Sequence, residues 1–141
     1  MKLLGLDLGD AWIGVAISDA LGMFARPLQT VPAQQLETHL KTILEKERIS
    51  SVVVGLPKTM RGTISEQTQK IINQAEHLKQ LFPTIEWVLW DERLSSQRAQ
   101  ALKPATSKEE KLQSHSRAAA FILQSYLDHL SMKRNTQADL P

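Results

Sequence analysis

Residues 52–90 read VVVGLPKTMRGTISEQTQKIINQAEHLKQLFPTIEWVLW, and this stretch decides the fold class. It opens with the continuous apolar run Val52–Leu56, which is typical of a strand buried on both faces. Thr63 and Glu66 form a capping box, and the apolar residues that follow recur at helical spacing as far as Phe82. Ile85–Trp90 predicts a second strand. A strand, a helix and a strand within about 40 residues predict a parallel crossover unit.

The residues before this unit predict a meander. Three short apolar runs, Leu3–Leu8, Trp12–Ser18 and Met23–Val31, are separated by turns and predict antiparallel strands. A helix is expected over Leu36–Leu44, where leucine and isoleucine recur at helical spacing.

The residues after the crossover unit predict helices. A short helix is expected over Leu94–Leu102, and a final helix begins near Ser107, is capped by Glu110 and ends near Met132. The order of elements predicts an α/β domain whose mixed five-stranded sheet has three antiparallel strands followed by parallel strands, with helices on its faces. We expect a single domain over 1–133 and a flexible polar tail over 134–141.

Length and composition exclude several classes of protein. With 141 residues and 15.8 kDa the chain has the size of one domain, and 42% hydrophobic residues suffice for a core. The absence of cysteine excludes a disulfide framework, a thiolate nucleophile and a cysteine zinc site. No apolar run is long enough to cross a bilayer, and the start MKLLGLDLGD does not resemble a signal peptide. We therefore expect a cytoplasmic protein without a membrane partner.

Basic charge is concentrated in one third of the chain. Residues 93–134 carry eight Lys and Arg against three acidic residues, a net charge of +5, within a chain of net charge +2. This asymmetry suggests a polyanionic partner, although charge alone favours the simpler interpretation, a solvated helix surface. The region contains few aromatic residues, so we do not expect several exposed bases to stack on it.

Asp7 is the first candidate for chemistry. Leu4, Leu6 and Leu8 point to one face of the first strand, so Asp7 points to the other. A carboxylate in a central strand is costly to desolvate unless it is paired, hydrogen-bonded or bound to metal. Its flanking glycines leave room for a phosphate. Metal or phosphate binding is favoured over capping of the turn.

Asp91, Glu92 and Arg93 directly follow the Ile85–Trp90 strand. The carboxyl ends of parallel strands are where such sheets bind ligands, and two adjacent acids offer one ligand whichever way the chain turns. These acids also suit the start of the helix expected from Leu94, and one acid can cap that helix while the other faces the site.

Two further groups add to the candidate site. His115 lies on the apolar stripe of the final helix, where a lone histidine is usually a core residue, but Asp7 and Asp91 or Glu92 are natural partners for it as a third ligand. Lys58 and Arg61 lie in the glycine-containing turn after the fourth strand, where cations and backbone amides can hold phosphates.

Seven blocks of the sequence resemble the YqgF family, also called RuvX-type or Holliday-junction-resolvase-like proteins, which is associated with pre-16S rRNA nucleases. Their order and spacing match over nearly the whole chain: Gly5–Gly9, Ile13–Asp19, Val54–Pro57, Gly62, Asp91–Ser95, Ala118–Ala119 and Ile122–Leu127. The Asp-Glu-Arg-Leu-Ser block is the most specific of them.

The resemblance implies a ribonuclease H-like fold and cleavage of nucleic acid with a divalent metal, Mg²⁺ or Mn²⁺. The family's acids map onto Asp7 and the Asp91–Glu92 pair, with Glu92 the first choice as ligand. His115 stands where the family usually has an aspartate, nine residues before Gln124. Imidazole suits Mn²⁺ better than Mg²⁺, which prefers oxygen.

The implied activity is hydrolysis of phosphodiester bonds, in the 5′-end maturation of pre-16S rRNA. Asp7, Glu92 and His115 would hold metal, with Asp91 as the alternative acid. The residues expected to contact nucleic acid are cations: Lys58, Arg61, Arg93 and Arg117. We expect a monomer or a weak homodimer.

Three alternatives follow from the same residues. A resolvase of Holliday junctions or other branched DNA would present similar backbone chemistry to the site. A non-catalytic nucleic-acid-binding module is suggested by His115 in place of the third acid. An ATPase of the actin and sugar-kinase type also has a phosphate loop like Gly5–Gly9, but it needs well over twice this length.

Overall fold

The computed structural model describes residues 1–57, 65–91 and 107–138. Nine elements follow one another in these ranges: β1 (Lys2–Asp7), β2 (Trp12–Ser18), β3 (Ala25–Pro32), the 3₁₀ turn η1 (Ala33–Gln35), α1 (Leu36–Lys46), β4 (Ile49–Leu56), α2 (Glu66–Leu81), β5 (Glu86–Asp91) and α4 (Lys108–Ala138). The short helix predicted over Leu94–Leu102 lies outside the described residues.

The five strands form one mixed sheet in the order β3-β2-β1-β4-β5. β1 pairs with β2, and β2 with β3, in the antiparallel sense, whereas β4 pairs with β1 and β5 in the parallel sense. The predicted meander and crossover unit are both confirmed. The parallel strands β1, β4 and β5 bring their carboxyl ends to the same edge of the sheet.

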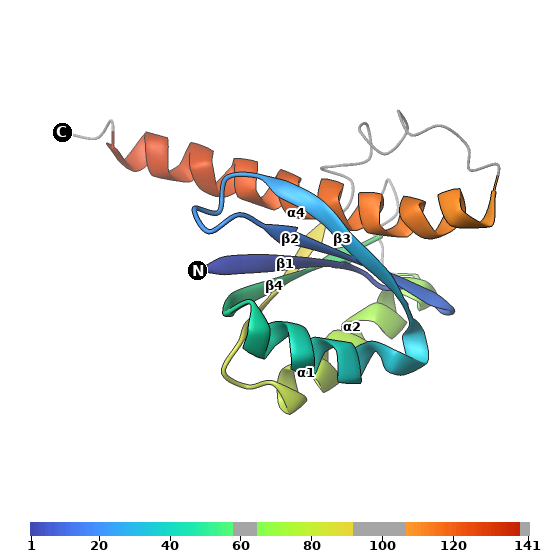
Figure 1. Cartoon of the computed structure of the whole chain (residues 1–141). Helices are drawn as coiled ribbons and strands as arrows, with labels where there is room; N and C mark the ends of the chain where they lie inside the picture. Colours follow the sequence, from blue (N-terminus) through green and yellow to red (C-terminus); the bar gives the residue numbers. More distant parts are fainter. Residues whose placement is uncertain (58–64, 92–106, 139–141) are drawn as a thin grey trace.

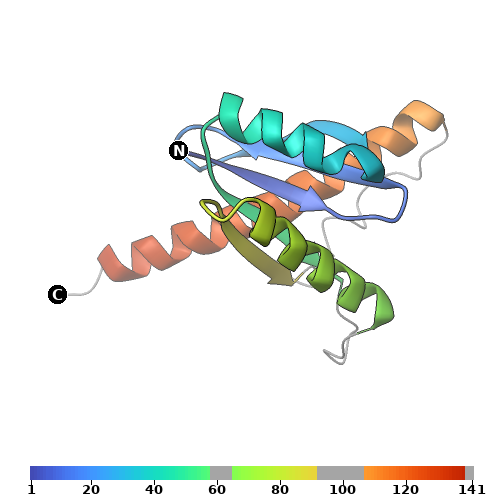
Figure 2. The same ribbon diagram turned by 90° about the horizontal axis from the view of Figure 1, so that it is seen from below.

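Helices cover both faces of this sheet. Figures 1 and 2 show α1 and α2 side by side on one face and α4 crossing the other. The first face buries a large aliphatic core that includes Leu4, Leu6, Val54 and Leu78. The second face buries a smaller core in which Ala16 and Val53 of the sheet meet Leu123 of α4. The sheet is therefore the middle of three layers.

Two helix boundaries differ from the sequence prediction. α2 begins at Glu66, and its N-cap is Ser65, whose Oγ accepts a hydrogen bond from the Thr68 amide at 3.1 Å, so the predicted cap at Thr63 is wrong. α4 begins as expected, with the Glu110 amide donating to Ser107 Oγ, but continues past Met132 to Ala138. Part of the expected polar tail is thus helical. None of the helices in the described ranges is long and apolar enough to span a membrane.

α4 lies unusually close to the strands beneath it because two positions lack side chains. A Cβ on Gly14 would lie 1.8 Å from the carbonyl oxygen of His115, and a Cβ on Gly5 would lie 2.8 Å from that of Ala119. Both obstacles are helix backbone, which cannot turn aside as a flexible side chain does. Glycine at these two positions therefore sets the height of α4 above the sheet.

We expect Gly14→Ala to lower the free energy of unfolding by about 3 kcal/mol, because overpacking against backbone must lift α4. Gly22→Ala is the control. Gly22 has φ of +68° but its added Cβ would meet only Leu3 Cδ1, at 3.7 Å, so its cost is limited to about 1 kcal/mol of backbone strain. Urea denaturation measures both. Equal losses of unfolding free energy in Gly14→Ala and Gly22→Ala would contradict the idea that the close approach of α4 to Gly14 excludes a side chain.

Candidate active site

Asp7 is the last residue of β1, and its side chain lies on the face of the sheet that α4 covers. Leu4 and Leu6 point into the core beneath α1 and α2, so the alternation of the strand turns Asp7 toward α4. This confirms the orientation predicted from the sequence. Asp7 is half-buried and lies at the carboxyl end of the central strand, where Figure 1 shows the first half of α4 passing over the sheet.

The environment of Asp7 raises the pKa of its carboxyl above the ordinary value of 3.8. Burial is the main cause, because a desolvated carboxylate is disfavoured relative to the neutral acid. The charge of His115 acts in the opposite direction and lowers the pKa. The structure therefore brings Asp7 and His115 within electrostatic reach of each other, although 108 positions of sequence separate them.

His115 is held in place by the packing of α4. Its backbone lies on Gly14, and the neighbouring Leu112 carbonyl accepts a hydrogen bond from Thr30 Oγ1 of β3. About two and a half helical turns beyond His115, Gln124 Oε1 accepts from the Ala25 amide at 2.8 Å. These contacts fix both the height and the position of α4 along the sheet, and so hold the backbone of His115 over Gly14, the residue that pairs with Asp7.

Asp91 takes the other face of the sheet. Val88 and Trp90 of β5 pack in the core beneath α4, so alternation places Asp91 on the side of α1 and α2, away from Asp7. Asp91 is thus not placed beside Asp7. Glu92 and Arg93 lie outside the described residues, as do Lys58 and Arg61.

Asp7 pairs with Gly14 across β1 and β2, and the backbone of His115 rests on Gly14, so a carboxylate and an imidazole belong to the same region of the described structure. No group of three His, Cys, Asp or Glu side chains suited to a metal ion occurs within the described ranges. A carboxylate and an imidazole are ligands that Mn²⁺ accepts. These two donors suit a divalent metal, but a metal site here requires at least one further ligand.

Trp90 is a structural contact near the candidate site that the sequence analysis missed. Its Nε1 donates to Ser125 Oγ of α4 at 3.1 Å, and its ring packs edge-on against Tyr126 with centroids 5.3 Å apart. It also lies 5.1 Å from the His129 ring. Trp90 therefore ties the end of β5, beside the Asp91–Glu92 pair, to the helix that carries His115. The one available signal was a tryptophan directly before those acids.

Arg117 does not join Asp7 and His115. Two residues along a helix correspond to a rotation of about 200°, so Arg117 and His115 point in nearly opposite directions. Arg117 is exposed, and it donates to Gln113 Oε1 at 3.2 Å and lines a hollow together with Ala25 and Pro27 of β3. The expected contact with nucleic acid therefore requires a surface on the other side of α4.

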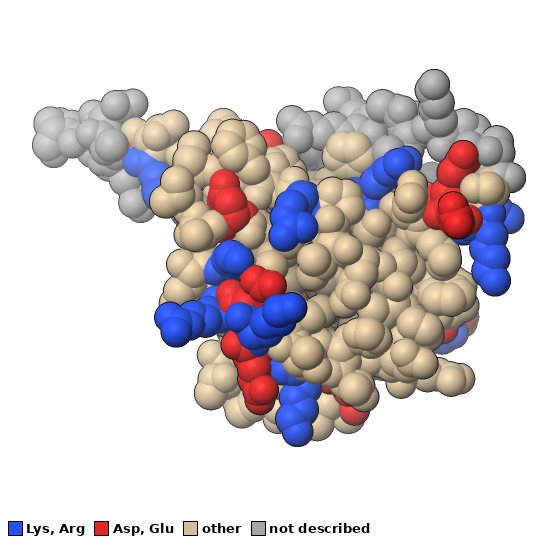
Figure 3. Space-filling view, in the orientation of Figure 1, with Lys and Arg blue, Asp and Glu red and all other residues tan. Residues whose placement is uncertain are grey.

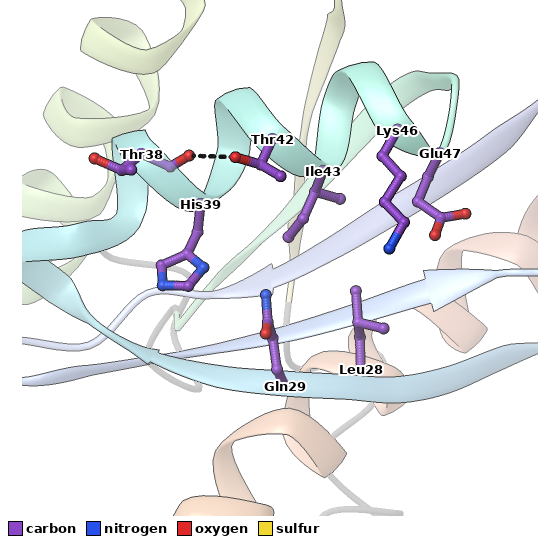
Figure 4. Close-up of a pocket in the computed structure, with 8 residues that line it drawn as sticks. All are labelled: Leu28, Gln29, Thr38, His39, Thr42, Ile43, Lys46 and Glu47. Carbon is purple, nitrogen blue, oxygen red and sulfur yellow. Dashed lines mark hydrogen bonds between the residues drawn. The ribbon is translucent and has the colours of Figure 1, made fainter.

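A separate pocket lies between α1 and β3, on the face of the sheet opposite Asp7. It has a volume of about 390 Å³, and Figure 4 shows His39 and Lys46 of α1 opposite Gln29 and Leu28 of β3. Glu47 lies at one end, and its carboxylate accepts from Lys2 Nζ at 2.8 Å, which lowers the pKa of Glu47. This mixture of charges is separated from the candidate site by the whole thickness of the sheet.

Within the described residues, the cations of the basic segment do not form one continuous basic face. The described cations of the +5 segment are all exposed and lie toward the two ends and the middle of α4: Lys108, Lys111, Arg117, Lys133 and Arg134. Figure 3 shows that acidic and basic side chains are intermixed over the C-terminal end of α1. Affinity for a polyanion must therefore come from individual sites on α4.

A sheet of order β3-β2-β1-β4-β5 with helices on both faces, and a half-buried carboxylate at the end of its central strand, define an α/β protein of the ribonuclease H-like class. Solved structures share the fold. The Thermus thermophilus RuvC structure has a TM-score of 0.62 at 16% sequence identity and covers 94% of this chain and 97% of its own. Thermus thermophilus RuvC in complex with a Holliday junction substrate has a TM-score of 0.63 at 17% identity, over 94% and 96% of the chains.

The chain belongs to the RuvX family, whose model, described as "Holliday junction resolvase", matches residues 1–129. A relative from Thermoanaerobacter pseudethanolicus, named "Putative pre-16S rRNA nuclease", is 40% identical over 91% of this chain and 96% of its own length. A protein of the same name from Staphylococcus haemolyticus is 39% identical over 92% and 96%. The family inferred from the sequence blocks is confirmed, and its members are named as nucleases.

We expect Asp7→Asn to stabilise the fold at neutral pH by about 1 kcal/mol, because it removes a desolvated charge. The pKa of Asp7 is raised in the folded state, so its contribution to stability is fully present below the unfolded value of 3.8 and is lost as the pH rises through the folded value. The advantage of Asp7→Asn should therefore grow from pH 3.8 upward and then level off.

Urea unfolding of both proteins across this pH range measures the difference. Asp10→Asn, which changes an exposed acid of the following turn, serves as the control. A wild-type chain more stable than Asp7→Asn at pH 7 would show that the carboxylate gains more from His115 than it loses by burial.

Proposed function

We propose that this chain is a nuclease that hydrolyses phosphodiester bonds of precursor 16S rRNA, in the maturation of its 5′ end, with the help of Mg²⁺ or Mn²⁺. The observation that carries the proposal is the pairing of Asp7 with Gly14, on which the backbone of His115 rests, in a chain of the RuvX family. We further propose that it acts in the cytoplasm as a monomer or a weak homodimer.

Asp7, His115 and Glu92 would hold the metal in this proposal, and Glu92 is the ligand that the described residues do not supply. When bound, a divalent ion would activate the attacking water and stabilise the negative charge on the leaving oxygen. The chain itself contributes the positions of the residues around the metal. Burial keeps Asp7 in a fixed place with little competing water, and the backbone contact at Gly14 keeps His115 beside it.

Lys58, Arg61 and Arg93 are proposed to position phosphates near the metal. All three follow the carboxyl ends of β4 or β5 in the sequence, and these ends meet at the edge of the sheet where Asp7 lies. A cation that contacts a phosphate fixes the register of the substrate without reading its sequence.

Cleavage of branched DNA is the second candidate, because the family description names a Holliday junction resolvase. Labelled RNA that spans the 5′ end of 16S rRNA and a synthetic four-way junction should be incubated with the purified chain and Mn²⁺. We expect the RNA to be cut and Asp7→Asn to lose at least about 100-fold in rate, because even the residues that only orient a metal ligand typically contribute about 10- to 100-fold. Preferential cutting of the junction would establish the alternative.

A third outcome of this experiment is binding without cleavage by the wild-type chain. It would identify a non-catalytic module and contradict the proposed activity. Cutting that survives Asp7→Asn would place the active site elsewhere.

We expect His115 to set the preference for the metal ion. Mn²⁺ should support cleavage at least tenfold better than Mg²⁺, because Mg²⁺ binds imidazole poorly. His115→Asp should shift the preference toward Mg²⁺. Thermal unfolding in increasing Mn²⁺ or Mg²⁺ gives a second readout, since a ligand that binds only the folded state raises Tm. An unchanged preference in His115→Asp would exclude His115 as a ligand.

A further inference from the structure

A hollow of about 290 Å³ lies on the outer side of α4, where the helix runs beside the edge strand β3. Its walls are mainly apolar, and the residues that line it are Ala25, Pro27, Arg117, Ala120, Phe121 and Gln124. Pro27 and the half-buried Phe121 present flat apolar surfaces, and the exposed Arg117 supplies a cation at one end. The volume is close to the lower limit for pockets that bind small molecules or single molecular groups.

The side chain of Gln124 connects α4 to β3 and so fixes the walls of this hollow. Gln124 Oε1 accepts from the Ala25 amide at 2.8 Å, while its Nε2 donates to the Met23 carbonyl at 3.0 Å. These two bonds hold β3 at a constant distance from α4. The hollow is therefore formed before any ligand arrives, which lowers the entropic cost of binding.

A second hollow, of about 520 Å³, continues along α4 and shares Gln124 with the first. Phe24 of the β2–β3 turn lines it and is 67% exposed, and Arg134 provides a cation at the far end. Its acid, Asp128, is already engaged, because its carboxylate accepts from Gln124 Nε2 at 3.0 Å. From Arg117 to Arg134 the helix rises about 25 Å.

We propose that these two hollows form a track for an unpaired nucleic-acid strand, in which one base enters the slot between Pro27 and Phe121 and a following base stacks on Phe24. Arg117 and Arg134 contact phosphates at the two ends. The inference rests on the proposed nuclease function and deepens it by naming a single-stranded region as part of the substrate. Aromatic rings combined with cations along a groove are how proteins bind single strands without reading their sequence.

The combination of groups in the track favours this occupant. A duplex keeps its bases paired and stacked, so it cannot fill an apolar slot of this size, whereas an unpaired base can. The sequence suggested no stacking surface because its basic segment is poor in aromatics. The fold supplies one by bringing Phe24, from a turn far away in the chain, to the same groove as Phe121.

Binding of fluorescein-labelled oligouridylate to the full chain, measured by anisotropy in EDTA, tests the track without cleavage. Phe121→Leu keeps an apolar helix residue and removes the ring. We expect it to weaken binding about tenfold, the usual scale for one lost base–aromatic contact, and Phe121→Trp to retain affinity. Arg117→Gln should weaken binding and reduce the slope of log affinity against log salt by about 1.

Matched controls come from the far face of the molecule. Leu81→Ala changes a 45% exposed leucine of α2, and Lys79→Gln removes a cation of the same helix, so both should bind like wild type. A duplex of the same length should be insensitive to Phe121→Leu. The same binding measurement with oligodeoxythymidylate shows whether the track prefers RNA or DNA.

Wild-type affinity in Phe121→Leu, or an equal loss for single strand and duplex, would overturn the proposal. Sedimentation provides a further result that would overturn the proposal. If Phe24→Ala and Phe121→Leu dissociate a dimer while RNA binding persists, the groove is an interface between two copies of the chain. Because binding is measured in EDTA, this result is independent of cleavage. Failure of the nuclease proposal is recognised separately, by the absence of metal-dependent cutting that requires Asp7.

Discussion

The backbone of α4 rests directly on two glycines of the sheet, and the functional geometry of the molecule depends on this contact. Any side chain at Gly14 would collide with the His115 carbonyl. With the helix at this height, Asp7 loses solvent and gains an imidazole neighbour in a single step. The close approach therefore creates both the energetic cost of the site, a buried carboxylate, and the group that offsets part of that cost.

α4 organises two surfaces because it is held along its whole contact with the sheet. The bond from Thr30 holds its first half, the Gln124 bonds hold β3 against its middle, and Trp90 attaches the end of β5 through Ser125. One side of the helix faces Asp7, and the other lines the groove with β3. A strand bound in that groove would be separated from the proposed metal ligands by the width of α4, about 10 Å.

The fold was largely predictable because its signals are local. Apolar runs, turns and helical spacing identify the strands and helices, and the crossover unit leaves few possible arrangements. The N-cap of α2 was placed at Thr63 because a capping box is visible there, yet Ser65 offers the hydroxyl that the helix uses. The end of α4 was placed too early because polarity alone does not end a helix that has begun.

The sequence by itself determined the family, the order of strands and helices along the chain and the orientation of Asp7, because motifs and strand alternation are read along the chain. Only the tertiary structure decided that Asp91 faces away from Asp7, that Arg117 and Phe24 line two hollows which share Gln124, and that Trp90 joins β5 to α4. These facts depend on which residues meet across the sheet, and such contacts are set by the twist and packing of whole elements rather than by any local pattern.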